Sequence, residues 1–360
     1  MKTVRALQWA ALLLQILVLG LGGRAEEETS PEGGECATAR DAPRGGGRVA
    51  VHPRSALPPL NFSSTVALRG EDVRIPAVGF GVFQSQPGDE TYNAVAVALA
   101  AGYRHIDTAQ FYENEADVAR AIRDSGIPRS DVFVTSKLWP FGTKADDEGE
   151  EGESYALYKA HGELATELAL RACLRSAELL GGYVDLMLLH SPHGEDPPAL
   201  YRALQEMQRR GLVRSIGVSN FAERHLRRLL AAPGIVMVPA VNQIELHPFL
   251  WDEERAALIA YCHREGIVVE SYSPLAQAER MDHPSVLAAA TKHRSTPGQV
   301  LLRWGLQMGW VVLPKSVTPE RIRSNLDLGH LALDGDDMAS LCRVGDEDLH
   351  VCWDPVKDVP

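Results

Sequence analysis

The sequence has no long run of Lys or Arg and no stretch in which basic and aromatic residues alternate. A nucleic-acid-binding surface depends on such clusters, so this class of function is excluded. Cysteine is also scarce, with five in 360 residues, which is too few and too widely spaced for a disulfide framework or a metal cluster. Charged residues make up 23% of the chain and apolar residues 45%, a composition typical of a globular protein with a sizeable core.

The cysteines have different expected surroundings. Cys173 and Cys262 fall in segments expected to be helical, where a thiol behaves as a small buried apolar group. Cys342 and Cys352 are considered as a disulfide pair. Because the count is odd, at least one thiol has no partner within the chain.

The first 25 residues have the pattern of a secretory signal. A basic start is followed by an apolar stretch from Ala6 to about Gly23, and the small residues Gly23 and Ala25 suit a cleavage site. We expect this signal to be cleaved and the protein to enter the secretory pathway, lumenal or secreted. The apolar stretch is also long enough to be an uncleaved anchor, which would bind the protein to a membrane, or to begin an organelle-targeting leader.

Two segments have the composition of solvated, irregular chain. Residues 26–64 are rich in Gly, Pro, Glu, Arg and Ser without an apolar period, which predicts a low-complexity spacer that ends near the glycosylation sequon Asn61-Phe62-Ser63. Residues 146–153 include six acids and account for half of the formal net charge of −12. They lie in an insertion over about 141–160, expected to be a solvated loop or, alternatively, a lid or partner site.

From about residue 65 the pattern changes to short apolar runs that alternate with helical segments. Such alternation indicates βαβ units and a parallel sheet. Eight runs predict an α/β fold in which one (β/α)8 TIM barrel spans residues 65–360, including a C-terminal tail. An early β-hairpin, 66–68 with 73–75, is expected to plug the bottom of the barrel. The predicted strands are 77–83, 103–108, 132–138, 184–190, 213–219, 241–246, 268–273 and 310–314, and helices are expected over 91–101, 163–180 and 197–210.

In a (β/α)8 barrel the active site lies at the C-terminal ends of the strands, so a polar residue that ends an apolar run is a candidate for catalysis. Asp107 and Tyr112 follow the second run, Lys137 ends the third, and His190 ends the fourth. We expect these four side chains to face one pocket. A charged Lys beside an Asp is expected to lower the pKa of the nearby Tyr112, which could then donate a proton near neutral pH while His190 holds a substrate oxygen.

These residues resemble the aldo-keto reductases, and the resemblance covers about residues 66–355. Residues 102–117 are similar to the first signature of that family, and residues 132–139 to its lysine strand. The resemblance implies a (β/α)8 barrel that reduces aldehydes and ketones with NADPH. It also implies a catalytic tetrad of Asp107, Tyr112, Lys137 and His190, with Tyr112 as the general acid. We expect a monomer that acts on a small carbonyl compound.

The resemblance also implies how the nicotinamide is held. Ser219, Asn220 and Gln243 match the residues that bind its carboxamide, and Tyr272 matches the aromatic ring that stacks on it. Orienting the ring decides which face delivers hydride. Ser273 and Leu275 continue the Tyr272 segment and are expected to contact the cofactor too.

The segment after the eighth run is expected to bind the far end of the cofactor. Lys315 and Arg321 provide two cations beside the hydroxyls of Ser316 and Thr318, a set that suits the extra phosphate of NADP(H). Asn325 matches the family residue that faces the adenine. A Glu commonly precedes that Asn in the family, whereas Ser324 stands there in this chain, so weaker adenine contacts are expected.

Phe83, Trp139 and His190 are expected to line the substrate pocket. Many carbonyl-reducing members carry an aromatic residue after the active-site His, but Ser191 follows it in this chain. Loss of one apolar wall predicts loose selectivity for substrate shape.

The sequence admits two other interpretations. The pairs His105 with Asp107 and His190 with His193 could serve a metal-dependent hydrolase, but no further carboxylate or His cluster follows the other runs, so no metal is expected. The second is an NADPH-binding sensor or regulatory subunit with little turnover, which the intact tetrad disfavours.

Overall fold

The protein is described from a computed structural model that covers residues 60–356, apart from 62, 70–72, 141–159, 348, 353 and 355. All of these residues belong to one compact unit, 50–360. The expected signal in residues 1–25, most of the spacer and almost all of the acidic insertion lie outside the described residues. No helix in the described part is both long and apolar enough to cross a membrane.

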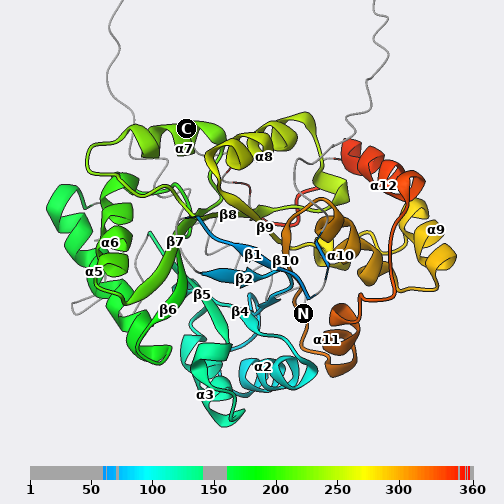
Figure 1. Ribbon diagram of the computed structural model, residues 1–360, viewed down its shortest axis with the longest axis horizontal. Coiled ribbons are helices and arrows are strands. Elements are labelled where there is room, and N and C mark those ends of the chain that lie inside the picture. The colour runs from blue at the N-terminus through cyan, green and yellow to red at the C-terminus, as the bar shows by residue number, and fades with distance from the viewer. Residues whose placement is uncertain are drawn as a thin grey trace, which may run out of the picture. The chain divides into compact units, whose positions relative to one another are not determined.

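Eight parallel strands form the centre of the molecule, in the spatial order of the chain (Figure 1). A parallel bridge between Val78 and Val312, together with the bond from the Gly79 N–H to the Val312 carbonyl (2.9 Å), joins the first strand to the last. The predicted (β/α)8 barrel is therefore confirmed. Its strands are β3 (Phe80–Gly81), β4 (His105–Asp107), β5 (Phe133–Leu138), β6 (Val184–Leu189), β7 (Val213–Ser219), β8 (Val241–Glu245), β9 (Val268–Tyr272) and β10 (Val311–Leu313).

Helices surround the strands (Figure 1). Their ends follow local rules: α10 starts at Pro297 after a capping box between Thr296 and Gln299, and α8 is followed by Gly266, whose φ of 70° favours glycine. The helices of the described residues are α2 (Asp89–Ala101), α3 (Glu115–Asp124), α5 (Gly162–Leu179), α6 (Pro197–Arg209), α7 (Glu223–Ala231), α8 (Glu253–Glu265), α9 (Pro284–His293), α10 (Pro297–Gln307), α11 (Pro319–Leu326) and α12 (Gly335–Cys342).

An antiparallel hairpin precedes the barrel, as predicted. It pairs β1 (Thr65–Ala67) with β2 (Arg74–Pro76). Its apolar Leu68, Val73 and Ile75 are buried in one cluster with Phe133, Val241 and Val311, the first residues of β5, β8 and β10. The hairpin, blue in Figure 1, thus closes the N-terminal end of the barrel and leaves the C-terminal end for chemistry.

The four described cysteines are all free thiols. Cys173 and Cys262 are fully buried on α5 and α8, as expected for small apolar groups. The pairing of Cys342 with Cys352 is wrong. Cys342 ends α12, whereas the Cys352 sulfur lies 3.4 Å from the Ser273 hydroxyl at the barrel mouth, so the two thiols belong to different surroundings.

Close packing between strands gives a first prediction. A Cβ at Gly217 would lie 2.6 Å from the Val241 carbonyl oxygen and 2.8 Å from Leu188 Cδ2. We expect Gly217→Ala to lower the free energy of unfolding by about 2 kcal/mol, because a backbone shift that relieves the clash would disturb the strand pairing of the barrel. Urea denaturation measures the change. The control is Gly335→Ala at the start of α12, where a Cβ meets no atom within 4 Å and the substitution should be neutral or stabilising. Equal stability of the two variants would contradict the packing argument.

Candidate active site

The loop after β4 holds Tyr112 at the mouth of the barrel. It forms a short 3-10 helix, η1 (Gln110–Tyr112), and is tied down by the fully buried Asn114. The Asn114 amide donates to the Val82 carbonyl (3.2 Å) and accepts a bond from the Thr108 hydroxyl (2.7 Å). These two bonds hold the loop against the chain that follows β3 and β4, so Tyr112 has a defined position.

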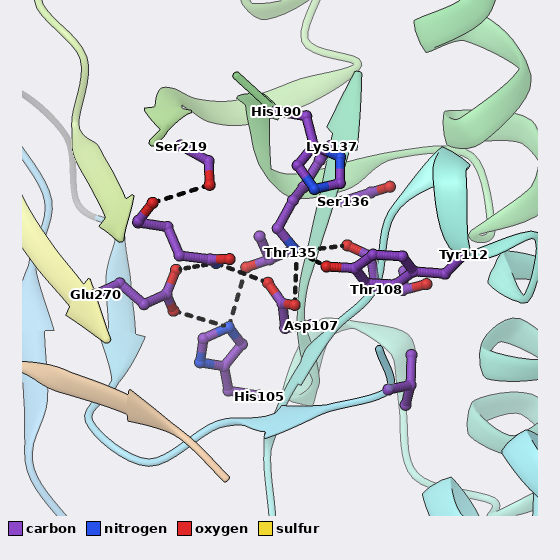
Figure 2. Close-up of polar contacts among 12 residues, drawn as sticks. His105, Asp107, Thr108, Tyr112, Thr135, Ser136, Lys137, His190, Ser219 and Glu270 are labelled. Atoms are coloured by element: carbon purple, nitrogen blue, oxygen red, sulfur yellow. Dashed lines mark hydrogen bonds and ion pairs between the residues drawn. The ribbon is translucent and has the colours of Figure 1, made fainter. Parts of the chain in front are cut away.

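Lys137 is the centre of the site (Figure 2). Its Nζ donates to Asp107 Oδ1 at 2.6 Å, to the Thr108 carbonyl at 3.0 Å and to the Tyr112 hydroxyl at 3.3 Å. An ammonium has three N–H groups, so each is used. Lys137 and Asp107 are buried, and the predicted convergence of Asp107, Tyr112 and Lys137 is observed.

The pKa of Tyr112 changes in the direction opposite to the prediction. Burial, followed by the negative charge of Asp107, raises the pKa of the phenol well above its ordinary value. Burial is the larger cause, because a phenolate loses its hydration inside the barrel, and the nearby Asp107 charge adds to it. Tyr112 is therefore protonated at neutral pH, and its proton is available for donation.

His190 completes the group of four. Its ring centroid lies 5.8 Å from that of Tyr112 and 5.0 Å from that of Trp139. Burial, and next the charge of Lys137, lowers the pKa of His190 well below its ordinary value. The imidazole is therefore neutral, with one N–H that can be donated to an oxygen of a ligand.

Aromatic rings form the walls beside His190 and Tyr112. The Phe83 ring lies 5.1 Å from that of Tyr112, and Phe111 stacks on Trp139 at 4.4 Å, a contact that the sequence analysis missed. Phe83, Trp139 and His190 thus belong to one group of rings around Tyr112, and their contact with substrate stays a prediction. Ser191 is buried, with its hydroxyl 3.1 Å from His193 Nδ1, and offers no apolar wall.

The residues expected to bind nicotinamide form a chain of hydrogen bonds across β7, β8 and β9. The Ser219 hydroxyl donates to the Gln243 carbonyl (2.9 Å), and the Asn220 amide donates to the His190 carbonyl (3.0 Å). The Tyr272 hydroxyl in turn donates to Asn220 Oδ1 (2.8 Å). This chain places the amide and hydroxyl groups next to His190. Asn220, which follows β7, and Ser273, which follows β9, have positive φ of 66° and 48°. Such strained backbone conformations are concentrated at functional sites.

The predicted phosphate-binding residues gather between β10 and the start of α11. Lys315 Nζ donates to the Gln84 carbonyl (3.4 Å), and the Thr318 N–H donates to the Ser316 hydroxyl (3.1 Å). Arg321 is exposed on α11. Leu275, which follows β9, and Asn325 of α11 both lie close to Gly298. A Cβ added to Gly298 would be 3.7 Å from the side chain of each.

Comparison with known proteins identifies the family. The family described as "Aldo/keto reductase family" matches residues 77–346, which is most of the barrel. The chain belongs to the aldo/keto reductase family. It is therefore an oxidoreductase.

Individual relatives agree with this assignment. An aldo-keto reductase of Mycolicibacterium smegmatis is 44% identical over 270 residues, covering 74% of this chain and 88% of that protein. Glycerol 2-dehydrogenase (NADP(+)) of Saccharomyces cerevisiae is 35% identical and covers 83% of this chain and 98% of its own length. Among solved structures, an aldo-keto reductase enzyme from a Medee basin deep-sea metagenome library superposes with a TM-score of 0.70 at 36% identity, covering 82% of this chain and 99% of that one.

Two buried carboxylates of this aldo-keto reductase were missed by the sequence analysis. Glu270 of β9 accepts a bond from the Gln243 amide at 2.6 Å, and Glu245 of β8 accepts bonds from the Val351 and Cys352 N–H groups at 2.9 and 3.3 Å. Side chains two positions apart on a strand point to the same face. Glu270 is two residues before Tyr272 and Glu245 is two after Gln243, so each glutamate shares a face with a residue expected to contact the cofactor. A charged residue inside an apolar strand was the available signal.

Two of the side chains considered for a metal site have other partners. His105 Nε2 lies 3.0 Å from the Thr135 hydroxyl, and Asp107 is bound to Lys137. Within the described part of the chain, no group of three or more His, Cys, Asp or Glu side chains could hold a metal ion.

Proposed function

We propose that this aldo-keto reductase reduces aldehydes or ketones to alcohols with NADPH, and that Tyr112 is the general acid. The observation that carries the proposal is the contact of the Lys137 ammonium with both the Tyr112 hydroxyl and the Asp107 carboxylate. A protonated phenol beside an ammonium can give up its proton because the charge that develops on its oxygen is stabilised at once.

The residues present fit NADP(H). Hydroxyl and amide groups of Ser219, Asn220 and Gln243 suit the carboxamide, which both donates and accepts hydrogen bonds. Lys315 and Arg321 suit a phosphate monoester. The buried His190 Nδ1 has no hydrogen-bond partner among the described residues, as expected of a ring whose function is directed at a ligand.

The side chains then have separate tasks. NADPH, when bound, supplies a hydride to the carbonyl carbon. Tyr112 donates its proton to the carbonyl oxygen, and Lys137, held by Asp107, stabilises the phenolate that forms. The neutral His190 orients the same oxygen through its N–H, while Phe83 and Trp139 keep water from the reacting carbon.

The relatives support a small carbonyl substrate. Glycerol 2-dehydrogenase (NADP(+)) and an aldehyde reductase of Saccharomyces cerevisiae, 38% identical over 298 residues, bear names of small-molecule oxidoreductases. By extension we assign this chain to aldehydes and ketones of that size, with loose selectivity because Ser191 adds no apolar wall.

A substitution at the phosphate end tests the choice of cofactor. We expect Arg321→Ala to raise the KM for NADPH about tenfold, because one charge-assisted bond to the 2′-phosphate is lost. NADH lacks that phosphate, so its KM should change less than about twofold. Steady-state kinetics with both cofactors and one aldehyde measure the difference. Arg323→Ala, two positions further along the same helix and also exposed, is the matched control, because residues two apart lie on opposite faces of a helix. Equal effects on NADPH and NADH would contradict the assignment.

A further inference from the structure

The Gln243 side chain lies between two buried carboxylates. Its Nε2 donates to Asp107 Oδ2 at 2.8 Å and to Glu270 Oε2 at 2.6 Å. An amide nitrogen has two N–H groups, so both are used, and the amide oxygen is left as the part of Gln243 that can accept a bond from a ligand. The two carboxylates thus orient the amide.

Glu270 is the member of this network with no task in the proposed mechanism. It is fully buried on β9, and its Oε1 has no hydrogen-bond partner among the described residues. The charged or titratable groups that face it are Asp107 and His105 from β4, Lys137 from β5 and Tyr112 from η1.

The charges of this network do not balance if both carboxylates are ionised. Burial lowers the pKa of His105 to about 3, so it is neutral, and Tyr112 is protonated. One ammonium, Lys137, then faces two carboxylates. Burial, followed by the charge of Asp107, raises the pKa of Glu270 to about 8. Near neutral pH Glu270 holds a proton and the network is neutral; above that value it carries one net negative charge.

We propose that Glu270 is a positioning residue that sets the preference of the site for oxidised over reduced cofactor, by placing a titratable negative charge behind the amide of Gln243. The inference rests on the proposed function, because it takes Gln243 to hold the nicotinamide carboxamide. The oxidised nicotinamide ring is positively charged and the reduced ring is neutral, so an ionised Glu270 attracts only the oxidised form. By linkage, binding of the oxidised form releases the Glu270 proton.

Direct binding measurements test this proposal without turnover. Calorimetric titration of the full chain with NADP⁺ and with NADPH, from pH 7 to 9.5, should show the Kd of NADP⁺ falling about tenfold as Glu270 ionises, equivalent to about one pKa unit of coupling. The Kd of NADPH should change less than about twofold. The 2′-phosphate titrates equally in both ligands, so their ratio isolates the charge at the ring.

Variants assign the effect to Glu270. Glu270→Gln keeps the shape and the amide contact but cannot ionise, so the Kd ratio should become independent of pH. Glu254→Gln, an exposed carboxylate on α8, is the matched control and should behave as wild type. If Glu270→Gln does not fold, the wild type still gives the answer: at pH 7.5, titrations in two buffers of different ionisation enthalpy should show proton release with NADP⁺ and none with NADPH.

The outcomes separate the two levels of the argument. A Kd ratio that does not change with pH in wild type, or that changes equally in wild type and Glu270→Gln, overturns the role of Glu270. Failure of wild type to bind either cofactor at any pH overturns the proposed function instead.

Discussion

Tyr112→Phe should reduce kcat for aldehyde reduction by about 10³-fold, because the substitution removes the phenolic hydroxyl, whose proton the carbonyl oxygen must receive. The ring stays, with its contacts to Phe83 and His190. The Kd of NADPH should therefore change less than about twofold. NADPH consumption with a panel of aromatic and aliphatic aldehydes, followed by cofactor titration of the same preparations, measures both quantities.

The matched control is Phe111→Leu, which changes a neighbouring ring that has no acidic proton. It should alter KM for bulky aldehydes while kcat stays within about fivefold. A Tyr112→Phe enzyme that still turns over would refute the assignment of the acid. Tight binding of NADPH by wild type with no turnover of any aldehyde would instead favour a cofactor sensor.

Lys137→Met should have the second large effect, on both stability and catalysis. The Lys137 ammonium is buried against Asp107 at 2.6 Å, and its removal leaves a buried carboxylate without a cation. We expect the free energy of unfolding to fall by about 3–5 kcal/mol. We also expect kcat to fall at least about 10²-fold, because the charge on Tyr112 after proton donation is no longer stabilised.

A double variant separates the two effects. Lys137→Met with Asp107→Asn has no unpaired charge, so urea denaturation should show most of the lost stability recovered. Activity should stay low, because the double variant still lacks the ammonium next to Tyr112. Recovery of activity together with stability would mean that Lys137 acts only as a structural partner of Asp107.

Much of the fold could be predicted from local pattern. Each observed strand of the barrel lies within the predicted run, as β5 (Phe133–Leu138) lies within 132–138, because a strand buried on both faces reads as a continuous apolar run with polar residues at its end. The tetrad was predicted for the same reason. Once the strands are parallel and in order, Asp107, Lys137 and His190 must meet at one edge.

Other features could not be predicted because they depend on distances between strands. The pKa of Tyr112 was expected to be lowered but is raised, because it depends first on how deeply the phenol is buried and next on the charge of the nearby Asp107. Glu270 was not predicted because its surroundings come from other strands. Gln243 lies on β8 and donates both to Glu270 on β9 and to Asp107 on β4. The prediction of a disulfide between Cys342 and Cys352 was wrong because residues that are close in sequence need not be close in space.

The sequence by itself determined the barrel, the order of its strands and the side chains that reach its mouth. These properties follow from the alternation of apolar and polar residues, which is local. Only the tertiary structure decided the charges: which carboxylate pairs with Lys137, which one holds a proton and why Tyr112 stays neutral. Charge states depend on burial and on separations of a few ångströms between residues that are far apart along the chain, and those separations exist only after the barrel has closed.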